Sequence, residues 1–189
     1  MLESVPNVSE GRDARSIAEI GDAFSTHSAV LDLHSDPDHH RSVFTLAGSE
    51  GDLGDALVAG ASRALARVDL SRHVGVHPRL GVVDVVPIVP LRSEQLPAAE
   101  AAARIVGERF ASELGLPVFF YARSGGGRRP AFFRMGGPGE LARRLTAGEL
   151  RQDLGPGVLD PARGAVLVGA RPPLVAYNVD LATGDVEIA

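Results

Sequence analysis

The amino-acid sequence predicts an α/β sandwich, in which helices lie mainly on one face of a mixed β-sheet. Strand-like and helix-like segments alternate along the chain in the order βαββαβ and then αβ. The apolar run at 81–89 is too continuous for a strand with one face in water, so it belongs at the centre of a sheet. With 189 residues, 44% of them hydrophobic and 23% charged, the chain is long enough to bury a substantial core.

The first third of the chain predicts a strand, a helix and a hairpin. Residues 2–8 form a short strand that breaks at 9–11, and apolar residues then recur at helical spacing from about residue 13. Two β-rich runs, 30–34 and 42–47, flank an Asp-Pro-Asp turn signal. This signal has a physical basis, because proline fixes φ and aspartate side chains bond to nearby backbone amides.

The rest of the chain continues the alternation of helices and strands. The basic, glycine-rich connection at 123–130 lacks the lysine of a phosphate-binding loop, so it is interpreted as a solvated loop in preference to an anion site. In order, the predicted elements are a helix at 52–68, the central strand at 81–89, a helix at 94–114, a strand at 117–122, the connection at 123–130, weak helical signals at 139–150, a turn-rich stretch, and two closing strands at 165–169 and 174–181.

The composition excludes several classes of function. A net charge of −5 argues against nucleic acid as a partner, although a local basic site for a small anion is compatible with it. No stretch of about 18 apolar residues predicts a membrane span, and the first residues lack the features of a signal peptide. The absence of cysteine excludes disulfides and thiolate chemistry and makes the cytoplasm the expected compartment. All 19 basic residues are arginine, so a Schiff-base lysine is excluded as well.

Six histidines are candidates for metal binding or proton transfer. His73 and His77 lie four residues apart, the spacing of a metal pair on a helix, but a glycine between them and a proline directly after them favour a loop. The adjacent histidines at 39 and 40 would point to opposite faces of a strand. A metal site is therefore not expected.

Acid/base chemistry is the better-motivated interpretation of the loop that holds His73 and His77. A histidine exchanges protons near neutral pH, and a loop at the end of a central strand is where α/β sheets place ligands. Arg79 adds an anion-binding guanidinium, and Asp84 could orient an imidazole or pair with the backbone. On residue types alone, catalysis and an ordinary loop are equally supported, and the charged run at 36–41 is interpreted as a solvated hairpin tip.

Several blocks occur in an order that matches a known family. They are VPNVSEGRD at 5–13, DHHRSVFTLAG at 38–48, DLSRHVGVHPRLGVVDVVPIVPL at 69–91, LGLPVFFYA at 114–122, DLGP at 153–156 and GARPPLVAYNVDL at 169–181. Together they resemble the N-terminal subdomain of glutamate formiminotransferase over nearly the whole chain. The resemblance implies that residues 1–181 form this subdomain and that residues 182–189 begin a linker to a C-terminal subdomain.

The resemblance implies a folate-dependent transferase that moves a formimino group between N-formiminoglutamate and N5 of tetrahydrofolate, in histidine degradation and one-carbon metabolism. It implies tetrahydrofolate as co-substrate, no metal or redox cofactor, and small-molecule substrates in place of nucleic acid or membrane partners. Strands exposed at a missing subdomain interface are compatible with a homodimer. Two alternatives remain open: a non-catalytic folate-binding or interaction module, and a relative that acts on another formyl or formimino folate.

The resemblance also implies functions for individual residues. The family's HPR(L/M)G motif places the catalytic histidine at His77, and a single imidazole could serve both proton transfers in turn. Arg41 and Arg79 would bind the glutamate carboxylates through bidentate guanidinium contacts, and the run at 36–41 would then form a wall of the substrate cleft. The implied substrate-binding and folate-binding positions are Asn7, His40, Arg41, His73, Arg79, Gly155, Pro156, Gly157, Val158, Leu159, Asp160, Pro161, Ala162, Arg163 and Gly164.

Overall fold

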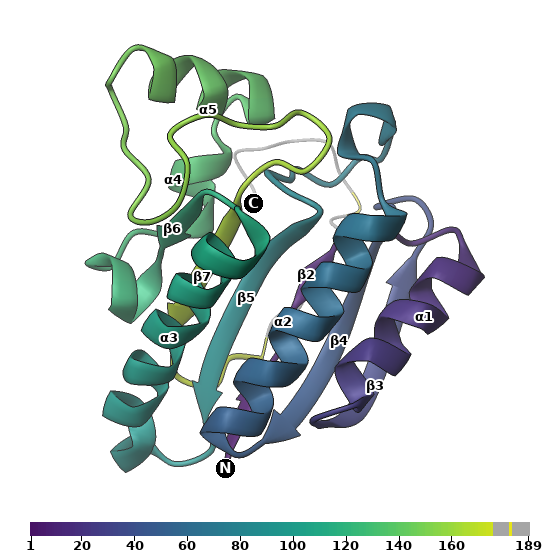
Figure 1. Ribbon diagram of the computed structural model, residues 1–189, viewed down its shortest axis with the longest axis vertical. Helices are drawn as coiled ribbons and strands as arrows, with labels where there is room; N and C mark the ends of the chain where they lie inside the picture. The colour runs from purple at the N-terminus through teal and green to yellow at the C-terminus, as the bar shows by residue number, and fades with distance from the viewer. Residues whose placement is uncertain (176–181, 183–189) are drawn as a thin grey trace.

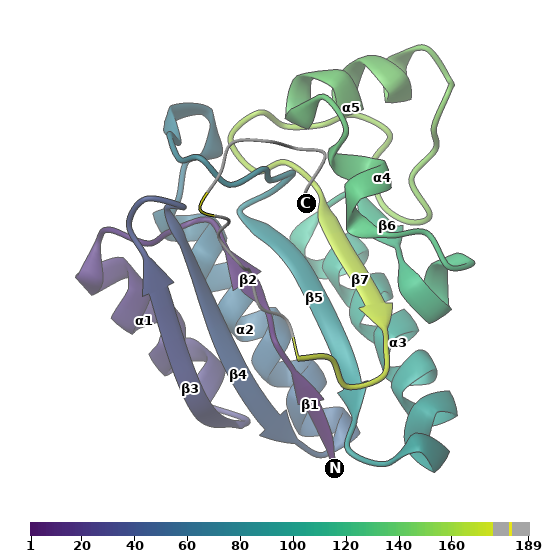
Figure 2. The ribbon, with the colours of Figure 1, turned by 180° about the vertical axis from the view of Figure 1, so that it is seen from behind.

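The computed structural model describes residues 1–175 and residue 182. They form a mixed β-sheet with three long helices on one face (Figures 1 and 2). The strands are β1 (Leu2–Ser4), β2 (Asn7–Val8), β3 (Ala29–Asp36), β4 (Arg41–Gly48), β5 (Val83–Pro90), β6 (Val118–Phe120) and β7 (Val166–Ala170). The helices are α1 (Ala14–Ser25), α2 (Glu50–Arg67), α3 (Leu96–Leu114), α4 (Pro130–Arg134) and α5 (Gly137–Thr146), with 3-10 turns at Leu70–Arg72, Ser93–Gln95 and Ala122–Gly125.

The described strands form one sheet in which β4 and β5 enclose the two short N-terminal strands. β1 and β2 each pair antiparallel with both β4 and β5. β3 forms one edge through its hairpin with β4, and parallel pairing of β5 with β7 and of β7 with β6 builds the other edge. The single strand predicted at 2–8 is split, because Pro6 has no amide hydrogen to donate and the register shifts after Asn7.

Alternate residues of the strands feed two cores on opposite faces of the sheet. The larger core lies under α1, α2 and α3 and includes Phe24, Leu57 and Val86. The smaller core lies on the opposite face, where Phe133 of α4 and Leu141 of α5 share a cluster with strand residues. The predicted α/β sandwich with helices mainly on one face is confirmed. Within the described part of the chain, no helix is long and apolar enough to cross a membrane.

The predicted helices begin and end where capping residues favour it. The carboxylate of Asp13 accepts from the Arg15 amide at 3.1 Å at the start of α1, and the hydroxyl of Ser49 accepts from the Asp52 amide at 3.3 Å at the start of α2. Gly115 ends α3 in the left-handed conformation, at φ 64°. The weak helical signals at 139–150 correspond to α5, which starts two residues earlier than predicted.

The prediction of a solvated loop at 123–130 is correct only in part, because residues 123, 126, 127 and 129 are exposed and the rest are partly or fully buried. The chain enters a 3-10 turn in which Ser124 and Gly125 are buried, and α4 begins at Pro130. Gly126 and Gly127 adopt positive φ angles of 65° and 82°, so the chain reverses and returns to the sheet edge. For the second closing strand, predicted at 174–181, residues 174 and 175 are not in a strand and residues 176–181 lie outside the described part of the chain.

Candidate active site

Two loops that are distant in the sequence meet at one end of the sheet. One joins β3 to β4 at 37–40, and the other precedes β5 at 73–82. The Val76 amide donates to the Asp38 carbonyl at 3.2 Å, and a Cβ on Gly75 would lie 2.6 Å from the His39 carbonyl oxygen. Only glycine permits so close an approach. The charged run at 36–41 therefore packs against the second loop, so the hairpin tip expected from residue spacing alone is not free in solvent.

His77 lies half-buried at this junction. Its Nε2 accepts a hydrogen bond of 2.5 Å from Nη1 of Arg41, and its ring meets the ring of His39 edge to face, with centroids 5.7 Å apart. Burial, followed by the charges of Arg41 and Arg134, lowers the pKa of His77 from 6.5 to about 4. The imidazole is therefore neutral near pH 7, and Arg41 occupies the lone pair of its Nε2.

Arg79 holds together the loop that carries His77. Its Nη2 donates to the carbonyls of His77 at 2.5 Å and Gly75 at 2.9 Å, and its Nη1 donates to Nδ1 of His73. A guanidinium has five donors in a fixed plane, so it can hold several carbonyls of one tight loop at once. These contacts give Arg79 a structural function in the loop, and the carboxylate-binding function implied by the family resemblance stays a prediction.

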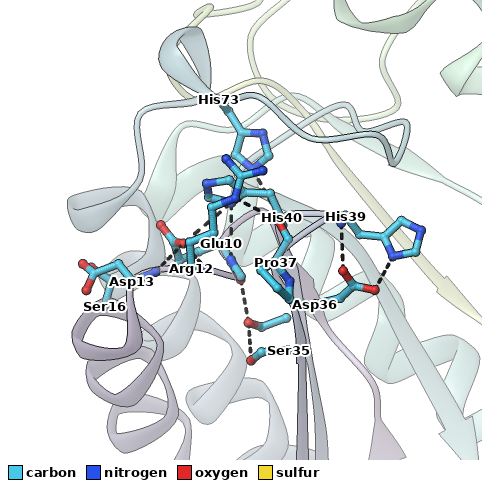
Figure 3. Close-up of polar contacts among 12 residues, drawn as sticks. Glu10, Arg12, Asp13, Ser16, Ser35, Asp36, Pro37, His39, His40 and His73 are labelled. Atoms are coloured by element: carbon cyan, nitrogen blue, oxygen red, sulfur yellow. Dashed lines mark hydrogen bonds and ion pairs between the residues drawn. The ribbon is translucent and has the colours of Figure 1, made fainter.

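His73 and His40 form a second pair of rings beside this loop (Figure 3). Their centroids are 4.0 Å apart, and Nε2 of His73 donates to the His40 carbonyl at 2.9 Å. Nδ1 of His40 accepts from the Gly11 amide at 3.3 Å and lies 3.6 Å from Oε1 of Glu10. Burial and then the charge of Arg79 lower the pKa of His73 to about 4, so this ring is also neutral near pH 7. Among the described residues, no three His, Asp or Glu side chains are arranged to hold a metal ion.

A buried ion pair contacts the end of the loop that carries His77. Asp84 is 1% exposed, accepts from the Leu80 amide at 2.6 Å, and pairs with Arg134 of α4. Asp84 is therefore paired with a backbone amide and an arginine, and it does not orient an imidazole. Burial raises the pKa of Asp84, and the charge of Arg134 opposes this rise. Arg134 is not predicted by the sequence, because no local pattern links it to an aspartate 50 residues earlier.

A groove runs from His77 toward the turn-rich stretch before β7. It consists of two adjoining hollows of about 310 and 270 Å³, which share Leu70 and Pro138. A larger hollow of about 680 Å³ between α1 and α2 is lined by none of the predicted site residues. The residues that line the groove are Leu70, Ser71, His73, Gly75, Val76, His77, Pro78, Arg79, Gly137, Pro138, Gly139, Ala142, Leu159, Asp160, Pro161 and Gly164.

The chain has recognisable relatives among known proteins. Residues 1–171 match the family model described as formiminotransferase domain, N-terminal subdomain. The chain belongs to this formiminotransferase family. It is 37% identical over 197 residues to a glutamate formimidoyltransferase of Thermoplasma acidophilum, a match that covers 100% of this chain and 64% of the relative.

Two further formiminotransferase relatives show the same pattern of coverage. A glutamate formimidoyltransferase of Streptococcus pyogenes serotype M1 is 35% identical over 199 residues, with 100% of this chain and 65% of the relative covered. A formimidoyltransferase-cyclodeaminase of Sus scrofa is 36% identical over 186 residues, with 96% of this chain and 34% of the relative covered. The chain thus spans less than two thirds of the length of these relatives.

The stretch that the formiminotransferase resemblance implies for folate is divided between the groove and the body of the protein. Its second half lines the groove through Leu159, Asp160, Pro161 and Gly164. Gly155 instead packs against the Leu116 carbonyl with φ at 83°, and Arg163 donates to the Leu114 carbonyl at 2.5 Å. Pro156, Gly157, Val158 and Ala162 do not line these hollows. Folate contact by the stretch as a whole stays a prediction.

Asn7, also implied by the formiminotransferase resemblance, lies within the sheet. Its Nδ2 donates to the Val5 carbonyl at 3.0 Å, and its neighbour Val8 points into the larger core, so Asn7 faces the side opposite α1, α2 and α3. The groove residues that the sequence does not predict include Leu70 and Pro138. The Gly-Pro-Gly turn signal at 137–139 marks the start of α5 in the sequence, but nothing in it indicates that α5 adjoins His77.

Proposed function

We propose that this protein transfers a formimino group between N-formiminoglutamate and N5 of tetrahydrofolate, with His77 as general acid and base. The observation that carries the proposal is the position of His77. A neutral imidazole lies at one end of a groove whose other end includes residues of the family's folate-contacting stretch. Family membership supports the same reaction, because the glutamate formimidoyltransferase relatives align over the whole of this chain.

The reaction requires two proton transfers. N5 of tetrahydrofolate attacks the amidine carbon of the donor, and N5 loses its proton to the imidazole of His77. The bond between this carbon and the glutamate nitrogen then breaks, and the departing amine gains a proton. The low pKa of His77 supports this order, because the ring must begin in the neutral form to accept a proton. No step calls on a metal or a redox cofactor.

Arg41 links donor binding to proton transfer. Its Nη1 donates a hydrogen bond of 2.5 Å to Nε2 of His77, so the ring cannot accept a proton there until Arg41 moves. A donor carboxylate is a stronger partner for a guanidinium than a neutral imidazole is, because charge-assisted contacts are shorter and stronger. Donor binding would therefore draw Arg41 away, free the lone pair and offset one of the charges that lower the pKa of His77.

The groove fits the flat pterin ring of tetrahydrofolate. Leu70, Pro138, Leu159 and Pro161 provide apolar surfaces in the hollow of about 270 Å³. This hollow continues into the one of about 310 Å³ beside His77, and small-ligand sites start at about 300 Å³. This reaction would place the protein in histidine degradation and one-carbon metabolism, and we propose the cytoplasm as its compartment.

We also propose that the protein forms a homodimer. The edge strand β3 exposes Leu31 and Leu33, which are 64% and 42% exposed, and an uncovered strand edge is suited to pairing with a second copy. Sedimentation equilibrium tests this directly, and a monomer at all accessible concentrations would contradict it.

Binding of tetrahydrofolate tests the groove separately from catalysis. Leu159→Asp puts a carboxylate on the apolar wall and should weaken binding by at least about tenfold, because an unpaired charge is costly to desolvate. Ile105→Asp, at a position 54% exposed on α3, is the matched control and should bind as the wild type does. Folate binding without any turnover would favour the non-catalytic module, and turnover of a formyl donor alone would favour a relative with another substrate.

A further inference from the structure

His39 and Asp36 form a hydrogen-bonded pair beside His77, and neither is among the residues implied by the family resemblance. Nδ1 of His39 lies 2.5 Å from Oδ2 of Asp36, and Figure 3 shows the ring turned toward this carboxylate. The rings of His39 and His77 meet edge to face, with an interplanar angle of 80° and centroids 5.7 Å apart. A second imidazole thus adjoins the proposed catalytic one.

Backbone contacts fix the pair in this position. Oδ1 of Asp36 accepts from the amides of Asp38 at 2.8 Å and His39 at 2.9 Å. The Val76 amide donates to the Asp38 carbonyl at 3.2 Å, which ties the turn to the loop of His77. The hydrogen bonds from the amide and ring of His39 lower the pKa of Asp36 to about 2, so this carboxylate is ionised at neutral pH.

The pair has the arrangement in which a carboxylate orients a catalytic imidazole. An ionised carboxylate can only accept, so Nδ1 of His39 carries a proton and Nε2 is left as the nitrogen that exchanges protons. The side chain of His39 is 39% exposed, so a substrate can reach it. The charged and titratable groups around the pair include His77, which touches the ring of His39, and Arg41, whose charge interacts with Asp36. Nη2 of Arg79 also lies 3.4 Å from the His39 carbonyl oxygen, to which it donates.

We propose that His39, oriented by Asp36, is a second catalytic acid and base, which protonates the departing glutamate amine while His77 takes the proton of N5. This inference rests on the transferase function proposed above. The bond between N5 and the amidine carbon forms, and the bond between that carbon and the glutamate nitrogen breaks. His39 enters this step as the imidazolium, with protons on both Nδ1 and Nε2. One proton moves from N5 to Nε2 of His77, and one moves from Nε2 of His39 to the departing nitrogen. A proton passed from His77 to His39 through water restores both rings.

Two imidazoles suit this reaction better than one. N5 and the departing nitrogen are different substituents of the same tetrahedral carbon, so a single ring would have to turn from one to the other within each turnover. A group already placed at each nitrogen avoids that reorientation, and correct placement is a large part of catalytic power. The edge-to-face contact of His39 and His77 provides two such groups in one site.

A comparison of leaving groups tests this division of functions. The two donors are N-formiminoglutamate and 4-(formimidoylamino)benzoate, whose aromatic amine is much less basic and departs with less help from an acid. His39→Gln should lower kcat/KM about 10²-fold with the first donor and less than about tenfold with the second. His77→Asn should lower both alike, and His27→Gln, at an exposed position beyond α1, should lower neither. Equal losses of His39→Gln on both donors, or no loss on either, would overturn the proposal.

A second measurement does not depend on turnover and so separates this inference from the proposed function. Imidazole ¹⁵N NMR of the purified chain, recorded at a pH high enough that His39 carries a single proton, should show that proton on Nδ1, and Asp36→Asn should shift it toward Nε2. A neutral His39 protonated on Nε2 in the wild type would contradict the inference even in an active enzyme. A wild type that forms no product would defeat the transferase proposal, and the NMR result would still decide whether Asp36 orients His39.

Discussion

Replacement of Arg41 by glutamine removes the positive charge beside His77 and keeps a side chain that can donate a hydrogen bond. Nη1 of Arg41 lies 2.5 Å from Nε2 of His77. After burial, this charge is the largest cause of the low pKa of His77, because a neighbouring positive charge disfavours the imidazolium. We therefore expect the pKa of His77 to rise in Arg41→Gln.

The structure sets bounds on the size of this rise. Removal of every perturbation would return the pKa of His77 from about 4 to 6.5. Arg41→Gln leaves burial and the charge of Arg134 in place, so only part of this difference should be recovered. We expect a rise of about one pKa unit, the lower end of the range for a close neighbouring charge.

NMR titration of the ring signals of His77 measures this pKa in each variant. Arg129→Gln, at an exposed position before α4, is the matched control and should leave the His77 titration unchanged. Glutarate, which carries two carboxylates, should raise the pKa of His77 in the wild type and raise it less in Arg41→Gln. A His77 pKa that stays at about 4 in Arg41→Gln would refute the proposed coupling between these two side chains.

Three further predictions concern stability. Gly75→Ala should lower the melting temperature, because its Cβ would lie 2.6 Å from the His39 carbonyl oxygen, whereas Gly51→Ala has open space on α2 and should melt at or above the wild-type temperature. Asp84→Ala should lower the free energy of unfolding in urea by about 3 kcal/mol or more, because it leaves the partly buried guanidinium of its partner without a counter-charge; a loss below about 1 kcal/mol would contradict the ion pair. In the folded chain the pKa values of His73 and His77 are about 4, whereas 6.5 is the ordinary value expected in the unfolded chain. Between pH 6.5 and about 4 the unfolded chain therefore binds more protons, and the free energy of unfolding should fall as the pH falls through this window. The fall should be shallower in His73→Gln, and an unchanged slope would show that His73 is not linked to folding.

Local signals in the sequence predict most of the fold. Helical spacing with capping residues such as Asp13 locates the long helices, and the apolar run at 81–89 locates the central strand. The errors occur where a contact distant in the sequence decides the structure. Ser124 is buried where its hydroxyl accepts from the Ala170 amide at 3.0 Å, 46 residues later, and a run of glycines and arginines carries no signal of that contact.

The candidate site is only partly readable from the sequence, for the same reason. The loop of His77 is predicted from its place before a central strand, and the family resemblance selects His77 within it. The contact between Arg41 and His77 spans 36 residues and depends on the register of β4 beside β2 and β5, which no local pattern specifies. The ion pair of Asp84 with Arg134 depends on the position of α4, a helix that is absent from the sequence prediction.

Transfer of the formimino group is the measurement that tests the central claim most directly. The purified protein, mixed with N-formiminoglutamate and tetrahydrofolate, should form formiminotetrahydrofolate and glutamate in equal amounts. His77→Asn, matched to the wild type in melting temperature, should lose at least about 10²-fold in kcat/KM. Equal rates for the wild type and His77→Asn, or a wild type that binds tetrahydrofolate and forms no product, would contradict the account.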